Sequence, residues 1–566
     1  MNPQATGRCS AATAPTTKAP LRLGVLIAAL LGSPMAFAQV PPDAGRLLQE
    51  MTIPPQPIPP SVQLDLTQDE VSSDMAPGGA QVELRSVSFH GATRFSQEVL
   101  HDLVADAIGQ RHDLGALRRL ASRVSRFYRQ HGYPFARAYL PPQRMAGGEL
   151  RVDVLEGRYG KITAVGEAKL AAQAQPFLSA LQPGDVIEGP SLERAALILG
   201  DQPNVVLTPV MTPGTEVGTG DFEARIQQGR RFEGVVGVDN HGNRYSGSNR
   251  LRVLGKWNSP FMLGDQIVAG GVRTNEDLWL GHLSYARPLG TSGLRAEASY
   301  AHTAYQLGKE FAAIGATGVA DVTAVGVSYP LLRTRTRNLI LSVQYQRKSL
   351  EDRYRLTHVV NEKSGRAIPL SLQFDLRDGW GGGGINYGML SWTSGSVGLR
   401  GADQRTVDAL TARSHGSYRK LNVDAARLQY LSPELSLFAR FAGQYSGSNL
   451  DSSEKFSLGG ANGVRAYPSG EGNGDRGWFG QIELRYSAGR ASPFAFFDAG
   501  AARINAKPWV AGENHRRIAG GGIGLRFAQD RLSLDGALAW SLRGGDPQAD
   551  SRRQQPHLWL KIDYAL

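Results

Sequence analysis

The chain has 566 residues, a hydrophobic fraction of 41% and a formal net charge of +11. This length exceeds one ordinary domain, and no apolar run long enough for a transmembrane helix follows the N-terminal segment. The basic residues are dispersed among acidic ones, without a basic run interleaved with aromatics, which argues against nucleic-acid binding.

Residues 1–38 are typical of a secretory signal peptide. Basic residues without any acid precede a short apolar run, Leu23 to Leu31, and Ala36-Phe37-Ala38 matches a small-residue cleavage site. The only cysteine, Cys9, lies in this segment. We therefore expect a mature chain without disulfides, a cysteine nucleophile or cysteine metal sites.

Residues 39–81 predict a short helix followed by a linker. Asp43 is placed to cap a helix that carries Leu47, Leu48 and Met51 on one side. The proline-rich stretch from Ile53 to Pro60 favours an extended chain, because proline cannot donate a backbone hydrogen bond.

Residues 82–157 predict a compact α+β domain. The pattern gives a strand from Val82 to Phe89, a helix that ends at Gly109 and a second helix from Asp113 to Gly132, followed by strands over 135–140 and 149–155. Residues 158–230 repeat this β-α-α-β-β order more loosely. Their strands are expected over 161–165, 205–210 and 222–227, and their helices near 177–181 and 191–199.

Residues 231–566 alternate between apolar and polar side chains, strand after strand. In the last strand Leu558, Leu560 and Tyr564 share one face, and Trp559 and Lys561 lie on the other. A soluble β-sandwich also alternates, but the charged set here is too large for a dry core. The pattern predicts a 16-stranded antiparallel transmembrane β-barrel with an apolar outer face and a polar lumen.

Two motifs identify a family resemblance. The long connection after the eleventh strand contains Val464-Arg465-Ala466-Tyr467, and the thirteenth strand contains Phe496-Phe497-Asp498-Ala499-Gly500. They resemble the V-R-G-Y and F-x-D-x-G motifs of two-partner secretion transporters, the haemolysin secretion/activation protein family. Ala466 stands where that family usually has glycine, and its methyl group restricts the backbone. The two β-α-α-β-β units are similar to the family's polypeptide-transport-associated (POTRA) domains.

The resemblance implies a set of site residues. The loop would fold back into the barrel so that Arg465 reaches Asp498. Strand alternation places Phe496, Asp498 and Gly500 on one face, toward the lumen, where Gly500 would leave room for the loop. Glu483 and Arg485 could extend this network. Two roles stay open for the Arg465–Asp498 pair: a static salt bridge, or a lock that transport requires. The helix near residues 43–51 would plug the resting barrel; the alternative is a disordered tail.

The resemblance further implies an outer-membrane protein of a Gram-negative bacterium, with its POTRA domains in the periplasm. It would secrete one dedicated large exoprotein, an adhesin, a haemolysin or a contact-dependent toxin, bound unfolded through the POTRA domains. Other expected partners are outer-membrane lipid and the barrel-assembly machinery that inserts the chain itself.

We find no phosphate loop, GxSxG, HExxH or paired metal ligands, so we expect neither an enzyme nor a cofactor or metal. The alternatives are an insertase that assembles other barrels and a passive porin, which would not need two α+β domains.

Overall fold

The computed structural model describes residues 41–50 and 80–566. The predicted signal peptide, Met51 of the predicted plug helix and the proline-rich linker lie outside the described residues. None of the described helices combines the length and the apolar character needed to cross a membrane.

The first α+β unit contains a three-stranded sheet. Its strands are β2 (Ser86–His90), β5 (Glu149–Leu155) and β4 (Arg137–Tyr139), with β2 and β5 parallel and β4 antiparallel to β5. The other elements are β1 (Val82–Glu83), α3 (Gln97–Asp102), η1 (Ala105–Ala107), β3 (Arg111–His112), α4 (Leu114–Gln130) and η2 (Ala146–Gly148). The carboxylate of Asp113 accepts the backbone N–H of Ala116 and so caps α4.

Two details of this unit differ from the predicted pattern. The expected strand from Val82 to Phe89 is divided into β1 and β2, and the expected first helix is divided into α3 and η1. Both breaks have one cause: β1 leaves the main sheet to pair with β3, and the backbone of Leu84 pairs with Gly109 and Gln110. The helix must therefore end early to bring residues 109–112 alongside β1.

The second α+β unit repeats the arrangement of the first. Its sheet has the order β6 (Arg158–Val165), β8 (Thr219–Gln228) and β7 (Val205–Pro213), and its helices are α5 (Ala168–Ala174), η3 (Gln175–Leu178) and α6 (Gly189–Gly200). Helix α5 was not predicted, because it buries only Leu170 and Ala174 and so leaves almost no apolar period in the sequence.

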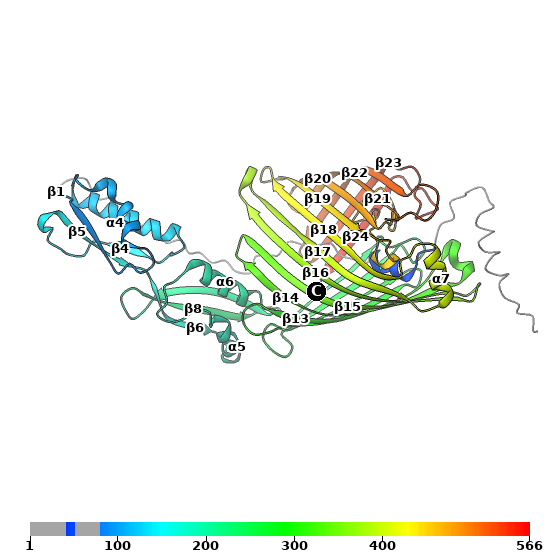
Figure 1. Ribbon diagram of the computed structural model, residues 1–566, viewed down its shortest axis with the longest axis horizontal. Coiled ribbons are helices and arrows are strands. Elements are labelled where there is room, and N and C mark those ends of the chain that lie inside the picture. Colours follow the sequence, from blue (N-terminus) through cyan, green and yellow to red (C-terminus); the bar gives the residue numbers. More distant parts are fainter. Residues whose placement is uncertain (1–40, 51–79) are drawn as a thin grey trace, which may run out of the picture. The chain divides into compact units, whose positions relative to one another are not determined.

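The remaining strands form a closed antiparallel barrel of sixteen strands, which confirms the predicted fold class (Figure 1). They are β9 (Phe232–Asp239), β10 (Arg250–Asn258), β11 (Gln266–Thr274), β12 (Trp279–Pro288), β13 (Arg295–Gln306), β14 (Ala316–Arg333), β15 (Arg337–Tyr354), β16 (Val359–Asp378), β17 (Gly384–Leu399), β18 (Gly416–Tyr430), β19 (Leu435–Ser446), β20 (Arg476–Tyr486), β21 (Ala491–Arg503), β22 (His515–Gln529), β23 (Leu532–Arg543) and β24 (His557–Ala565). The barrel closes where β24 pairs with β9, from Lys561 opposite Asp239 to Ala565 opposite Val235.

Alternation along each strand separates the two faces of the wall. In β19 the ring of Phe441 is 48% exposed on the outer face, whereas Phe438 is 8% exposed inside. In β24 the corresponding fractions are 50% for Leu558 and 4% for Trp559. Apolar side chains therefore face outward, as lipid requires, and polar and aromatic ones fill the lumen.

The two ends of the barrel have different connections. One end has short turns, one of which contains η5 (Trp380–Gly382), and the other carries η4 (Lys309–Ile314), α7 (Ala402–Leu410) and the long loop 447–475 with η6 (Ser452–Glu454). Outer-membrane barrels place short turns in the periplasm and long loops outside, so the long-loop end is the extracellular end.

Candidate functional site

The loop 447–475 turns back into the barrel. Its tip is a tight turn in which Val464 N–H donates to Leu458 O (2.8 Å) and Tyr467 N–H donates to Val464 O (3.1 Å). Val464 and Tyr467 are buried, and they pack with lumen side chains of β20 to β24. The sequence motif thus lies at the innermost part of the loop.

Arg465 at this tip makes a two-pronged ion pair with Asp498 of β21. Its Nη2 lies 2.7 Å from Asp498 Oδ1, its Nε lies 2.8 Å from Oδ2, and its backbone N–H also donates to Oδ2 at 3.1 Å. Both side chains are buried. This parallel geometry is the strongest form of a guanidinium–carboxylate pair, and it fixes the direction as well as the position of the arginine.

A second carboxylate extends the network. Arg465 Nη1 lies 2.5 Å from Glu483 Oε1, and Glu483 Oε2 is shared by Arg485 (2.7 Å) and Arg526 (3.2 Å). The guanidinium of Arg465 also stacks 3.6 Å from the centroid of the Phe496 ring. The structure therefore brings together Arg465, Asp498, Glu483, Arg485 and Phe496.

Trp559 and Gln481, which the sequence did not assign to the site, bind the backbone of the tip, and Tyr467 of the motif adds further contacts. Trp559 Nε1 donates to Arg465 O (2.7 Å), and Gln481 Nε2 donates to Gly463 O (2.8 Å). The hydroxyl of Tyr467 donates toward Arg543 O (2.9 Å) and Gly545 O (3.0 Å). Inward alternation marks Trp559 and Gln481 as lumen residues, but their loop partners depend on how the loop folds, which alternation does not show.

The structure explains how the loop accommodates alanine at position 466. A Cβ atom added to Gly520 of β22 would lie 2.3 Å from the Cβ of Ala466, so the methyl group uses space that the barrel wall leaves open. The φ angle of Ala466 is not positive, so its methyl group causes no backbone strain. Gly500 allows the same close approach, because an added Cβ would lie 3.0 Å from Leu458 of the loop.

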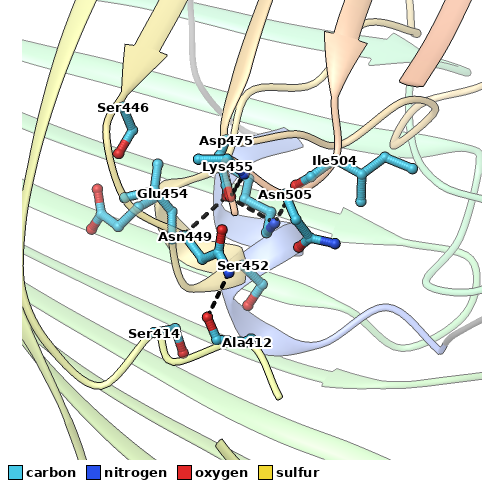
Figure 2. Close-up of polar contacts among 12 residues, drawn as sticks. Ala412, Ser414, Ser446, Asn449, Ser452, Glu454, Lys455, Asp475, Ile504 and Asn505 are labelled. Atoms are coloured by element: carbon cyan, nitrogen blue, oxygen red, sulfur yellow. Dashed lines mark hydrogen bonds and ion pairs between the residues drawn. The ribbon is translucent and has the colours of Figure 1, made fainter. Parts of the chain in front are cut away.

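The base of the loop is fastened to neighbouring extracellular connections (Figure 2). Asn449 Nδ2 donates to Ala412 O at 2.7 Å, beyond α7, and Lys455 Nζ donates to Ile504 O at 2.8 Å, beyond β21. Lys455 also pairs with the buried carboxylate of Asp475 at 2.8 Å. The loop is therefore held at both its tip and its base.

Helix α2 (Ala44–Glu50) lies inside the barrel against the first part of this loop. Leu47 is buried and Leu48 is partly buried, both among apolar side chains of β13 to β15 and of the extracellular connections before them. Ala44 N–H donates to Asp352 of β15 (2.9 Å), and Asp43 pairs with Lys363 of β16 (3.1 Å). Asp43 also caps the helix by accepting the N–H of Arg46 at 2.9 Å, as the sequence predicted.

Lys363 has a second carboxylate partner. Its Nζ lies 2.9 Å from Asp451 of the loop. The next turn of the loop is held to the wall by Glu454, which pairs with Lys420 at 2.9 Å and Lys348 at 2.6 Å. The charged side chains of Lys363 and Glu454 near α2 therefore each have ionic partners that do not belong to the helix.

A cavity of about 540 Å³ lies in the lumen beside these elements. Gln49 of α2 and the loop residues 459–463 line one part of it. The rest is lined largely by β15 to β19, and the uncharged inward side chains of β15 to β17, which we call the neutral wall, are Ser342, Gln344, Gln346, Ala367, Pro369, Ser371, Met389, Ser391 and Thr393.

Comparison with known proteins assigns a family to this architecture. The family model described as haemolysin secretion/activation protein ShlB/FhaC/HecB matches residues 218–527, and the ShlB-type POTRA model matches residues 82–157. The chain is similar to the heme/hemopexin transporter protein HuxB of Haemophilus influenzae, with 26% identity over 80% of this chain and 81% of that protein.

Two further similarities agree with these matches. The outer membrane transporter CdiB of Dickeya dadantii is 24% identical over 84% of this chain and 86% of that protein. The solved structure of CdiB from Escherichia coli superposes with a TM-score of 0.70 at 19% identity, covering 92% of this chain and 95% of that one, and shows the same fold. The chain therefore belongs to the haemolysin secretion/activation protein family ShlB/FhaC/HecB.

Proposed function

We propose that this chain exports one dedicated large exoprotein from the periplasm to the cell surface through the lumen of its barrel, without nucleotide hydrolysis. The chain is an outer-membrane transporter of the two-partner secretion type. The observation that carries the detailed proposal is the loop tip held in the lumen by Arg465, beside a polar cavity that Gln49 of α2 helps to line.

The contacts of α2 support its role as a removable plug. Helix departure would take Asp43 away from Lys363, but Lys363 would keep Asp451 as its partner. Asp352 would lose the N–H of Ala44 and keep the hydroxyl of Tyr305. An unpaired buried charge is strongly destabilising, so these shared partners lower the free-energy cost of opening.

The α+β units are suited to receive an unfolded partner. Each has a three-stranded sheet, whose outer strands are β2 and β4 in the first unit and β6 and β7 in the second. An extended segment can add to such an edge through main-chain hydrogen bonds, while neighbouring side chains provide selectivity. We propose that the exoprotein binds in this way before it enters the barrel.

The neutral wall offers a path for the moving chain. Serine, threonine and glutamine both donate and accept hydrogen bonds, so they can pair with any extended backbone. Inward side chains of a strand recur at every second residue, as the amide groups along one side of an extended peptide do. A surface without charge does not trap or repel the charged side chains of the passing protein.

The names of the relatives do not point to one common cargo. HuxB is named for heme and hemopexin, whereas CdiB is named only as an outer membrane transporter, and their identities to this chain are 26% and 24%. We therefore propose that the chain exports a single exoprotein, which is an adhesin, a haemolysin, a contact-dependent toxin or a haem-acquisition protein.

Deletion of the gene tests this proposal against the insertase alternative. We expect one large protein to disappear from the medium or cell surface, while the set of outer-membrane barrels stays constant. An Arg465→Ala copy that reaches the membrane should fail to restore the missing protein. A general loss of barrel proteins would instead identify an insertase.

A further inference from the structure

The outer face of β15 to β18 changes character near the extracellular end. Along each strand the outward side chains are apolar up to one level and then become arginine or serine. The change occurs from Tyr345 to Arg347, from Ile368 to Arg366, from Trp392 to Ser394 and from Leu421 to Arg419. Since the apolar band of a barrel spans the hydrocarbon core, these polar side chains lie at the level of the outer-leaflet headgroups.

The three arginines are exposed and have no charged partner among the described residues. Arg347 and Arg366 are direct cross-strand neighbours, an arrangement in which like charges repel. Other outward arginines nearby are paired: Arg353 with Glu351 and Arg400 with Glu362. The three unpaired arginines therefore give this patch of the wall a net positive charge.

A hollow lies within this patch. It has a volume of about 660 Å³, and small side chains form its floor while Arg366, Arg419 and Tyr345 stand around it. Four serines line it. Three of them lie on the strands, where Ser396 is the cross-strand neighbour of both Arg366 and Ser417, and Ser394 is the neighbour of Arg419; the fourth is Ser448. We call this feature the arginine hollow.

We propose that the arginine hollow binds the phosphate group of a lipid headgroup in the outer leaflet. Guanidinium groups bind phosphate oxygens through paired hydrogen bonds, and serine hydroxyls can donate further ones. An anion here would remove the repulsion between Arg347 and Arg366. The apolar side chains directly below, such as Ile368 and Leu421, are placed to contact the acyl chains of the same molecule, which a free phosphate ion would not use.

The test uses the full-length protein in detergent with three probes: bisphosphorylated lipid A, its dephosphorylated form, and inorganic phosphate. Binding is followed by native mass spectrometry and by the melting temperature of the barrel. We expect the phosphorylated lipid to bind and the other two probes to bind at least tenfold more weakly. The double variant Arg366→Ser, Arg419→Ser should weaken lipid binding by about tenfold or more, because each arginine contributes to headgroup attraction.

The matched control is Arg353→Ser, which removes a paired arginine from the same face and should leave binding unchanged. Equal binding of the phosphorylated and dephosphorylated lipids would overturn the proposal, and this comparison needs no variant that might fail to fold. Equal binding of inorganic phosphate would also overturn it, since the hollow would then be a site for free phosphate. An effect of Arg353→Ser as large as that of the double variant would mean that only the overall charge matters.

Discussion

Two sectors of the barrel interior obey the same alternation and yet serve different purposes. On β20 to β22 the inward side chains include Glu483, Arg485, Asp498 and Arg526, and the two carboxylates are buried against Arg465 of the loop. On β15 to β17 the side chains of the neutral wall are uncharged and line an open cavity, and Lys348, the next inward residue of β15, is paired with Glu454. A charged wall selects one fixed partner geometry, whereas a neutral wall accepts many.

The two sectors should therefore respond differently to a change in side-chain charge. Removing the guanidinium that pairs with Asp498 leaves a buried carboxylate without that partner. Adding a charge to the neutral wall leaves the fold intact and alters only what moves past it. The first change should act on the position of the loop, and the second on transport.

The largest expected effect follows from Arg465→Ala. This change leaves the buried carboxylate of Asp498 without its guanidinium, which costs about 3–5 kcal/mol for a buried pair. We expect the loop to become accessible to protease and export to fall more than tenfold, while the barrel remains folded. Immunoblots of the secreted partner and limited proteolysis measure both effects.

Arg485→Ala is the matched control for that change. Glu483 would keep Arg465 and Arg526 after this change, so export should fall much less. Equal losses from the two substitutions would show that the lumen charge, and not the position of the loop, limits export.

A smaller effect is expected at the uncharged contact between Ala466 of the loop and Gly520 of β22. Gly520→Ala would place a methyl group against Ala466, and such overpacking typically costs about 1–3 kcal/mol. The loop should again become accessible to protease. Ala466→Gly in the same chain should recover part of the loss, because it removes one of the two clashing methyl groups; no recovery would argue against this contact.

An added side chain can also displace helix α2, the proposed plug. An added Cβ at Gly45 of α2 would lie 2.6 Å from both Ser452 Oγ and Ser453 N, so Gly45→Val should push the helix from its seat. We expect higher ion conductance across planar bilayers, since α2 would no longer fill the lumen. Gly379→Val, at a periplasmic turn with open space around it, should leave conductance unchanged. Equal conductance of the Gly45→Val variant and the wild type would contradict the plug assignment.

The neutral wall is tested by adding a charge to it. Ser391→Asp should slow export several-fold, because a single charge interacts with passing charges by about 1 kcal/mol in a wet lumen. Ser391→Asn is the neutral control and should export normally. The difference between the two variants should shrink at high salt, where charges are screened.

The smallest effect concerns a buried carboxylate outside the lumen. Burial acts to raise the pKa of Glu156 in the first α+β unit, but hydrogen bonds from Thr93, Arg94 and Tyr128 outweigh it, so the pKa lies below its ordinary value near 4.5. Because the pKa is lowered in the folded unit, ionised Glu156 stabilises this unit at pH values above its ordinary pKa. This stabilisation is lost as the pH falls through the lowered pKa of the folded state. Local opening of residues 82–157 in the full-length protein, measured by hydrogen exchange, should increase as the pH falls below the ordinary pKa of Glu156. The Glu156→Gln substitution should remove this pH dependence.

The sequence predicted the parts of the molecule that depend on local patterns. Alternation gave the strand number and the inward positions of Asp498 and Trp559, and the capping position of Asp43 gave the start of α2. The partners of Lys363 and Gly520 were not predictable, because they come from segments about 90 and 54 positions away in the chain that only the folded loop brings together. The weakly periodic helix α5 was missed for a different reason, since few of its side chains are buried.

The most direct test of the central claim places a photocrosslinker at two adjacent positions of β17 in cells that export the partner. Ser391 faces the lumen and Leu390 faces lipid, so the two variants differ only in the side of the wall that they probe. We predict that position 391 forms an adduct with one large exoprotein and that position 390 does not. Adducts with many barrel proteins at position 390, or none with an exoprotein at position 391, would contradict export through the lumen.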